Sequence, residues 1–135
     1  MSYKSDTIST IIKQINSEFY LPAIQREFVW NPSQIIQLFD SIVRGYPISS
    51  FLFWKLDDEN RDKWEAYKFI DHARQGGTHN EQAVIDGAQN LAFVLDGQQR
   101  LTALLIGLKG QYTIKKKYRR KNDPSAWSAH RLYLD

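Results

Sequence analysis

The first regular pattern of apolar residues in the chain has the spacing of an α-helix. Four isoleucines recur at intervals that place them on one helix face: Ile8, Ile11, Ile12 and Ile15. Asp6 or Thr7 stands before this stripe, and either side chain can cap a helix by accepting a bond from a free backbone N–H. We therefore expect a helix over residues 7–16. Residues 18–24 then predict a short extended segment, which Pro22 confines to a sheet edge or a bulge.

A second helical pattern is bounded by clear start and stop signals. Asn31 can cap the helix, Pro32 suits its first position, and Gln34 completes a capping box. Five apolar residues form the stripe that we expect to be buried: Ile35, Ile36, Phe39, Ile42 and Val43. Gly45 then ends the helix, and Pro47 prevents its continuation.

A third helix is predicted directly after the sequence VLDGQQR. Four leucines line one face of it: Leu101, Leu104, Leu105 and Leu108. Gly110 marks its end. The helix is expected to begin near residues 98–100.

Short strands are expected between and after these helices. The runs that predict them are residues 50–56, 83–85, 91–95, 111–120 and 131–135, with a turn at 123–128. Residues 57–82 are polar and include Gly76-Gly77, so we expect a surface loop, and a variable insertion, around one short strand at 65–70. The mixed order of helices and strands predicts a single domain over residues 1–135, of the α+β or mixed α/β class.

Composition narrows the kind of protein without giving its function. The chain has 135 residues, of which 42% are apolar, so it can bury the core of one domain. It has no cysteine, which excludes disulfides and thiolate metal sites. It has neither an apolar run of membrane-spanning length nor a secretion signal, so we expect a cytoplasmic protein without membrane contact. It ends just after a strand-like run, and we expect it to be the N-terminal part of a longer protein.

The dipeptide Asp-Gly occurs twice within twelve residues, in two different contexts. Asp86-Gly87 lies between two apolar runs, which predicts the turn of a β-hairpin. Asp96-Gly97 lies between a strand and a helix. A helix N-terminus presents free backbone N–H groups and the positive end of the helix dipole, which favour an anion. The second Asp-Gly is therefore the candidate binding site.

The residues around the second Asp-Gly have the chemistry of a phosphate site. Gly97 lets the backbone approach a ligand closely, and Arg100 provides a fork of donors suited to phosphate. Amides and a hydroxyl come from Gln98, Gln99 and Thr102, and Asp96 can hold Mg²⁺ or a bound water. A purely structural alternative has equal weight, in which Asp96 caps the helix, Gln99 completes a capping box and Arg100 is solvated.

A second candidate group lies at residues 24–30, between the proline-marked segment and the second helix. Arg26 can contact a phosphate or a base, although pairing with Glu27 on the surface is the more ordinary arrangement. Trp30 can stack on a base, although a tryptophan beside apolar neighbours more often fills the core.

Net charge is only +3, but basic residues are concentrated near the C-terminus. The basic stripe consists of Lys115, Lys116, Lys117, Arg119, Arg120 and Lys121, interleaved with Tyr112 and Tyr118. Such a stripe is typical of DNA-binding surfaces, which contact phosphates through Lys and Arg. The alternative is a solvated strand edge on which lysines prevent aggregation.

Two stretches of the sequence together resemble a known family. LPAIQREFVWNPSQIIQLFDSIVRGYPISSFLFW and FVLDGQQRLTALL contain the matching pieces QR-x-x-x-W, SI-x-x-G-x-P-I and DGQQRLT, over residues 19–54 and 91–108. The combination resembles the N-terminal domain of GmrSD-type restriction proteins, a prokaryotic family with a ParB/sulfiredoxin-like fold. The resemblance implies an α+β fold in which helices flank a mixed sheet.

The resemblance also implies a nucleotide site and a role in phage defence. DGQQR occupies the place of the nucleotide-binding arginine motif of ParB-like domains. Carried onto this chain, the implied site comprises Asp96, Gly97, Gln98, Gln99 and Arg100, with Gln25 and Arg26 beside them. Relatives of this kind are similar to NTP-binding or NTP-hydrolysing modules, some of which recognise modified DNA that a separate C-terminal nuclease domain cuts. The implied partners are therefore an NTP, DNA and a nuclease domain or subunit.

Two alternatives to an NTPase remain at this point. One is a DNA-binding or modification-sensing module that uses the basic stripe without hydrolysis. The other is a nuclease domain, which the scattered residues His72, His79 and His130 do not favour.

Overall fold

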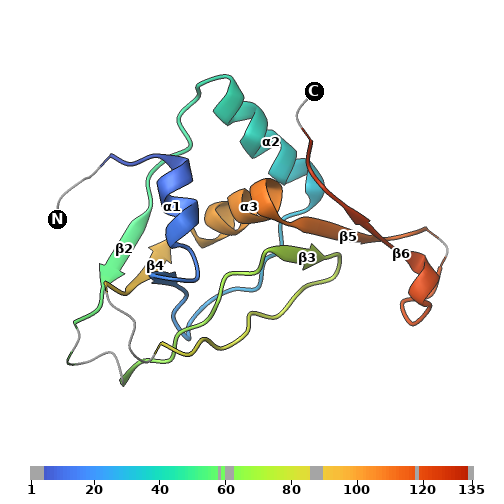
Figure 1. The fold of residues 1–135 in the computed structure, drawn as a ribbon. Helices are drawn as coiled ribbons and strands as arrows, with labels where there is room; N and C mark the ends of the chain where they lie inside the picture. Colours follow the sequence, from blue (N-terminus) through green and yellow to red (C-terminus); the bar gives the residue numbers. More distant parts are fainter. Residues whose placement is uncertain (1–4, 58, 60–62, 86–89, 118, 134–135) are drawn as a thin grey trace.

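The computed structural model describes residues 5–57, 59, 63–85, 90–117 and 119–133, and these form an α+β fold (Figure 1). The helices are α1 (Ile8–Gln14), α2 (Pro32–Val43) and α3 (Gln98–Lys109), with a short 3₁₀ helix, η2 (Pro124–Ala126). The strands are β1 (Phe19–Tyr20), β2 (Leu52–Lys55), β3 (His72–Arg74), β4 (Ala92–Asp96), β5 (Gln111–Lys115) and β6 (Trp127–His130). They form two three-stranded sheets, ordered β1-β4-β2 and β3-β5-β6.

The starts of α1 and α2 confirm the capping signals in the sequence. Thr7 caps α1, and its hydroxyl oxygen accepts a hydrogen bond from the backbone N–H of Thr10 at 3.2 Å. At α2, the side chain of Asn31 accepts from the backbone N–H of Gln34, and the side chain of Gln34 accepts from that of Asn31, both at 2.9 Å. The capping box is therefore complete, and it fixes where α2 begins.

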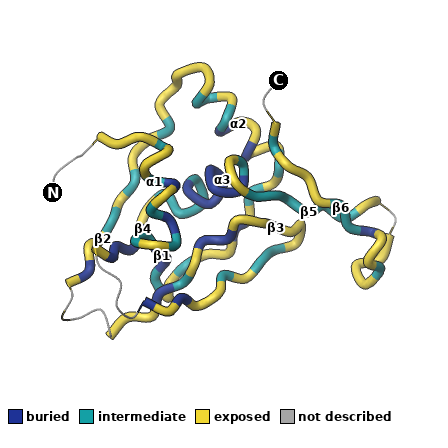
Figure 2. Tube along the Cα trace, in the orientation of Figure 1, coloured by how far each residue is buried: buried dark blue, intermediate teal, exposed yellow. Residues whose placement is uncertain are grey.

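Helix α3 is the centre of the fold. Its residues Leu101–Ile106 are all buried, so the helix is covered on every side over nearly two turns (Figure 2). The expected stripe of four leucines is wrong at its last member, because Leu108 is 52% exposed. Leu108 lies in the final turn, where the helix leaves the core, and Ile106 is buried in its place.

Helix α2 packs on α3 with a narrower stripe than the sequence predicted. Ile35 and Leu38 are buried, and Phe39 and Ile42 pack partly against the core. Ile36 and Val43, predicted to be buried, are 53% and 66% exposed. The predicted stripe was too wide because the core covers only one side of α2. Ile36 and Val43 lie at the margins of that side and face solvent.

Strand β4 joins the two apolar clusters of the protein. It pairs with β1 in parallel and with β2 in antiparallel orientation. Successive side chains of a strand point to opposite faces of the sheet. Accordingly, Val94 belongs to the main core around α3, whereas Phe93 belongs to a smaller cluster with Tyr20 and Leu56. The burial on both faces holds β4, and therefore the segment that follows it, in place.

The segment 57–82 differs from the expected surface loop. Its strand is β3 rather than residues 65–70, although Tyr67 makes isolated bridges to Leu21 and Gln82. In its described part the segment also buries four side chains, those of Ala66, Phe69, Ile70 and Ala73. The polar composition of the segment concealed these apolar residues, because exposed or half-buried positions separate Ala66, the pair Phe69-Ile70 and Ala73 from one another.

Two further strand boundaries differ from the prediction. Residues 83–85 form no strand beyond the bridge at Gln82, and the predicted hairpin turn at residues 86–89 lies outside the described residues. The last strand is β6, which begins within the expected turn region 123–128 and ends at His130, and residues 131–133 are not in a strand. Antiparallel pairing with β5 determines where β6 lies, which a local pattern does not reveal.

Candidate functional site

The junction between β4 and α3 has the predicted order of strand, turn and helix. Gly97 is the N-cap of α3 and has a φ of 89°, in the left-handed region that favours glycine. A Cβ at this position would lie 2.9 Å from Cε1 of Phe51 and closer still to Cδ1. Gly97 is therefore required both for its backbone conformation and for the close approach of Phe51.

The capping-box alternative for this junction is wrong. Asp96 accepts a hydrogen bond from the N–H of Gly97 at 3.0 Å, but no side chain caps the first turn of α3. Gln99 does not reach back to the cap. Its amide instead accepts from the N–H of Val29 and donates to the carbonyl of Glu27, both at 3.1 Å. The N-terminus of α3 is thus open toward its surroundings.

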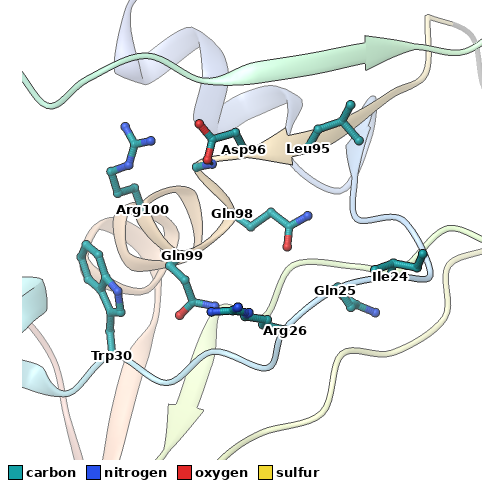
Figure 3. A pocket seen from close by; sticks show the side chains of 10 residues that line it. Ile24, Gln25, Arg26, Trp30, Leu95, Asp96, Gln98, Gln99 and Arg100 are labelled. Carbon is teal, nitrogen blue, oxygen red and sulfur yellow. The ribbon is translucent and has the colours of Figure 1, made fainter.

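An open pocket of about 510 Å³ lies in front of this N-terminus (Figure 3). It brings together seven of the residues predicted for the site: Gln25, Arg26, Asp96, Gly97, Gln98, Gln99 and Arg100. Ile24, Trp30 and Leu95 complete its lining. The two candidate groups, about 70 residues apart in sequence, are held together by the bonds of Gln99 to the backbone of residues 27–29.

Arg100 makes contacts that the sequence did not indicate. Its guanidinium donates to the carbonyl of Ile48 at 2.6 Å and to that of Ser50 at 3.0 Å, and lies 4.7 Å from the centre of the Phe51 ring. Ser49 between them has a φ of 75°, which is rare for a residue with a side chain. Arg100 is therefore not a solvated residue. It fixes the loop between α2 and β2, and its remaining N–H groups are the ones left for a ligand.

The other polar side chains of the pocket differ in how many of their polar atoms are hydrogen-bonded within the protein. Gln98 donates to the carbonyl of Val94 at 2.8 Å, and its oxygen accepts no bond from the described residues. The side-chain oxygen of Gln25 is buried and has no hydrogen-bond partner among the described residues. Arg26 is exposed, has no ion-pair partner within the described parts of the chain, and extends toward Gln99 (Figure 3). Its neighbour Glu27 pairs instead with His79.

Thr102 departs from what the sequence suggested, whereas Trp30 agrees with one of its two alternatives. Thr102, a predicted nucleotide ligand, is 4% exposed, and its hydroxyl donates to the carbonyl of Gln98 at 2.8 Å. It does not line the pocket, because position 102 lies on the buried side of α3. Trp30 packs against the main core, as the more ordinary alternative predicted, and it also lines the pocket.

The basic stripe does not line this pocket. It begins at Lys115, the last residue of β5, and β5 leads away from the C-terminal end of α3 (Figure 1). The pocket lies at the N-terminal end of this helix. Lys115 donates to the carbonyls of Lys116 and Arg119, and Arg119 lies 3.7 Å from the carboxylate of Asp123. Lys116, Lys117 and Arg120 are exposed, and Tyr118 lies outside the described residues.

The histidines and carboxylates that the structure describes are scattered over the fold. Within the described ranges, no three His, Asp or Glu side chains lie together as a metal site would require. His72 pairs with its neighbour Asp71, and His130 is in β6. The same ranges contain no helix long and apolar enough to cross a membrane.

Comparison with known families matches the chain to one of them over almost its whole length. The model of the GmrSD restriction endonuclease N-terminal domain matches residues 8–134. The chain belongs to this family. The resemblance found in the motifs is thereby confirmed, and the match also spans segment 57–82 of this GmrSD N-terminal domain. No curated protein matches the chain.

Proposed function

We propose that this GmrSD N-terminal domain binds a nucleoside triphosphate in the pocket before α3 and hydrolyses it, as the regulatory domain of a phage-defence restriction protein. The proposal depends mainly on one observation: two segments that are distant in sequence lie together at the N-terminus of α3. Residues 24–30 bring Arg26, and the DGQQR segment brings Arg100, to the same pocket as the uncapped first turn of α3.

The charges of the pocket suit a polyphosphate. Two arginines and the positive end of a helix dipole face a single carboxylate, that of Asp96. Backbone N–H groups at a helix N-terminus and guanidinium groups are both strong donors to phosphate oxygens. Apolar walls from Ile24, Trp30 and Leu95 provide a surface for a base or sugar. We therefore assign the phosphates to the α3 side and the nucleoside to the side of residues 24–30.

The pocket also fits Mg²⁺ brought in with the nucleotide. Magnesium in proteins is commonly held by one or two carboxylates, with phosphate oxygens and water completing its shell. Asp96 is exposed and lines the pocket, so it would be the protein's ligand. Bound there, the ion would neutralise charge on the phosphates.

Hydrolysis would depend on the positioning of the attacking water and on the stabilisation of negative charge on the phosphate oxygens. Gln98 is the residue best placed to orient an attacking water, because its oxygen is available while its nitrogen is fixed by Val94. The side-chain oxygen and nitrogen of Gln99 are both hydrogen-bonded to the backbone of residues 27–29. Gln99 is therefore a positioning residue, which holds this segment beside the DGQQR segment. Arg26 and Arg100 would stabilise charge on the phosphate oxygens.

The whole protein would couple this nucleotide state to DNA cleavage. The family is named for a restriction endonuclease, and this chain matches its N-terminal domain. We propose that a separate nuclease domain or subunit makes the cut and that nucleotide binding controls it.

The test is a binding panel of ATP, GTP, CTP and UTP with Mg²⁺, by calorimetry, followed by release of inorganic phosphate. Arg26→Ala should weaken binding about tenfold or more, because charge-assisted hydrogen bonds are worth about 1.5–3 kcal/mol. Arg26 has no hydrogen-bond or ion-pair partner in the described residues, so this loss isolates its contact with the ligand. Arg100→Ala should also weaken binding, and Gln98→Ala should lower turnover more than affinity.

Thr102→Val is the matched control, because it changes the same helix without reaching the pocket. It should bind nucleotide as the wild type does. The proposal is wrong if none of the four nucleotides binds, or if both arginine variants bind as tightly as Thr102→Val.

A further inference from the structure

A second polar pocket lies in the other sheet, between the end of β3 and the turn that precedes β6. Its volume is about 400 Å³, and it is open to solvent. The side chains of Arg74, Lys121, Asn122 and Trp127 line it, together with the backbone turn at Gly76 and Gly77. Three separate parts of the chain therefore contribute to it, and none of them belongs to the nucleotide pocket.

Arg74 is the central residue of this second pocket. Its guanidinium carbon lies 3.6 Å from the centre of the Trp127 ring, so the guanidinium rests against the indole. No carboxylate pairs with Arg74 among the residues for which the structure gives positions. Stacking on an aromatic ring holds a guanidinium in place while its N–H edge stays available to planar or tetrahedral oxyanions.

The surroundings of Arg74 are fixed by hydrogen bonds. The indole N–H of Trp127 donates to the carbonyl of Lys121 at 3.0 Å. Strand β3 pairs in parallel with β5, and the side chain of Gln75 accepts from the N–H of Lys115 at 2.9 Å. These bonds hold Arg74, Trp127 and the start of the basic stripe in a fixed arrangement in the absence of a ligand.

The charge around this pocket is mainly positive, and the one carboxylate close to Gly77, that of Glu27, pairs with His79 among the described residues. The basic stripe contributes six Lys or Arg residues between positions 115 and 121, and it adjoins the pocket through Lys121. The nearest acid in sequence, Asp123, is engaged by Ser125 and Arg119. A row of cations longer than one side chain matches a ligand with repeated negative charges, which a single phosphate or carboxylate would not fill.

We propose that this surface binds the phosphodiester backbone of a nucleic acid, with one phosphate between Arg74 and Lys121 and the neighbouring phosphates on the basic stripe. A lysine-rich strand edge that served only solubility would need neither a stacked arginine nor a fixed tryptophan. The lining of this pocket shares no residue with that of the nucleotide pocket, so the proposal does not rest on nucleotide binding.

The experiment measures fluorescence anisotropy with labelled oligonucleotides of equal length: duplex DNA, single-stranded DNA and RNA. Affinity is followed from low to moderate salt for the wild type and for Arg74→Gln. At about 0.1 M salt the variant should bind about tenfold more weakly, and its salt slope should fall by about one, because one phosphate contact is lost. The ranking of the three oligonucleotides identifies which nucleic acid is preferred.

Lys13→Gln is the matched control, since it removes one exposed positive charge from α1. It should bind as the wild type does. Lys121→Gln provides a second variant from another segment, in case Arg74→Gln unfolds, and should show the same loss of affinity and slope. Circular dichroism establishes that each variant is folded.

Three results would overturn the proposal. The first is no binding of any oligonucleotide at low salt. The second is a loss in the pocket variants no larger than that in Lys13→Gln. The third is equally tight, Arg74-dependent binding of polyglutamate or of anionic lipid vesicles, which would assign the surface to another kind of polyanion.

Discussion

Replacing Gly97 with alanine tests the geometry on which the candidate nucleotide site depends. Two costs are expected. An L-residue in the left-handed conformation costs about 1–2 kcal/mol, and φ at Gly97 is 89°. The added Cβ also overlaps the Phe51 ring, and overpacking of this kind typically costs about 1–3 kcal/mol. Gly97→Ala should therefore lower the free energy of unfolding by about 2–5 kcal/mol, a large share of the total for a domain.

Urea denaturation, followed by circular dichroism, measures this loss as a lower midpoint at unchanged slope. A double-mutant cycle with Phe51→Ala separates the two costs. In the Phe51→Ala background the overlap disappears, so Gly97→Ala should then cost only the conformational part, about 1–2 kcal/mol. An equal cost in both backgrounds would refute the close approach of Phe51, and no cost in either would refute the left-handed backbone as well.

Two further changes test the core and the pH response. Leu104→Asp should abolish cooperative thermal unfolding, because it places a carboxylate where the side chain is 1% exposed. The matched change Leu108→Asp, at an exposed position of the same helix, should leave the melting temperature within a few degrees, and equal damage from both would mean that the helix register is wrong. Hydrogen bonds from the Ser125 side chain and backbone lower the pKa of Asp123, so its stabilising contribution is present at neutral pH and is lost as the pH falls below about 4. Asp123→Asn should therefore melt below the wild type at pH 6, with the two melting temperatures converging toward pH 3, and a constant difference would contradict the pKa shift.

The features that the sequence predicted well are those whose partners lie close together along the chain. The two residues of the capping box, Asn31 and Gln34, are three positions apart. Gly97, within the DGQQR motif, is the N-cap of α3. Apolar spacing similarly located the three helices. Such patterns depend on local geometry, which repeats with the period of the helix.

The features that the sequence could not predict join distant segments, often through the backbone. Arg100 contacts the carbonyls of Ile48 and Ser50, and any residue type would supply those acceptors. Gln99 likewise bonds to main-chain groups some 70 residues away. The stacking of Arg74 on Trp127 depends on the pairing of β3 with β5 and of β5 with β6. No local signal in the chain indicates these contacts, so they become visible only in the folded molecule.

The burial of α3 on all sides has a consequence for the spacing of the two proposed surfaces. At about 1.5 Å of rise per residue, its twelve residues span about 18 Å. The nucleotide pocket lies at one end of this length, and β5, which leads to the basic stripe, begins at the other. A helix enclosed by its core has no room to slide or tilt alone. The packing therefore fixes the distance between the proposed nucleotide pocket and the start of β5.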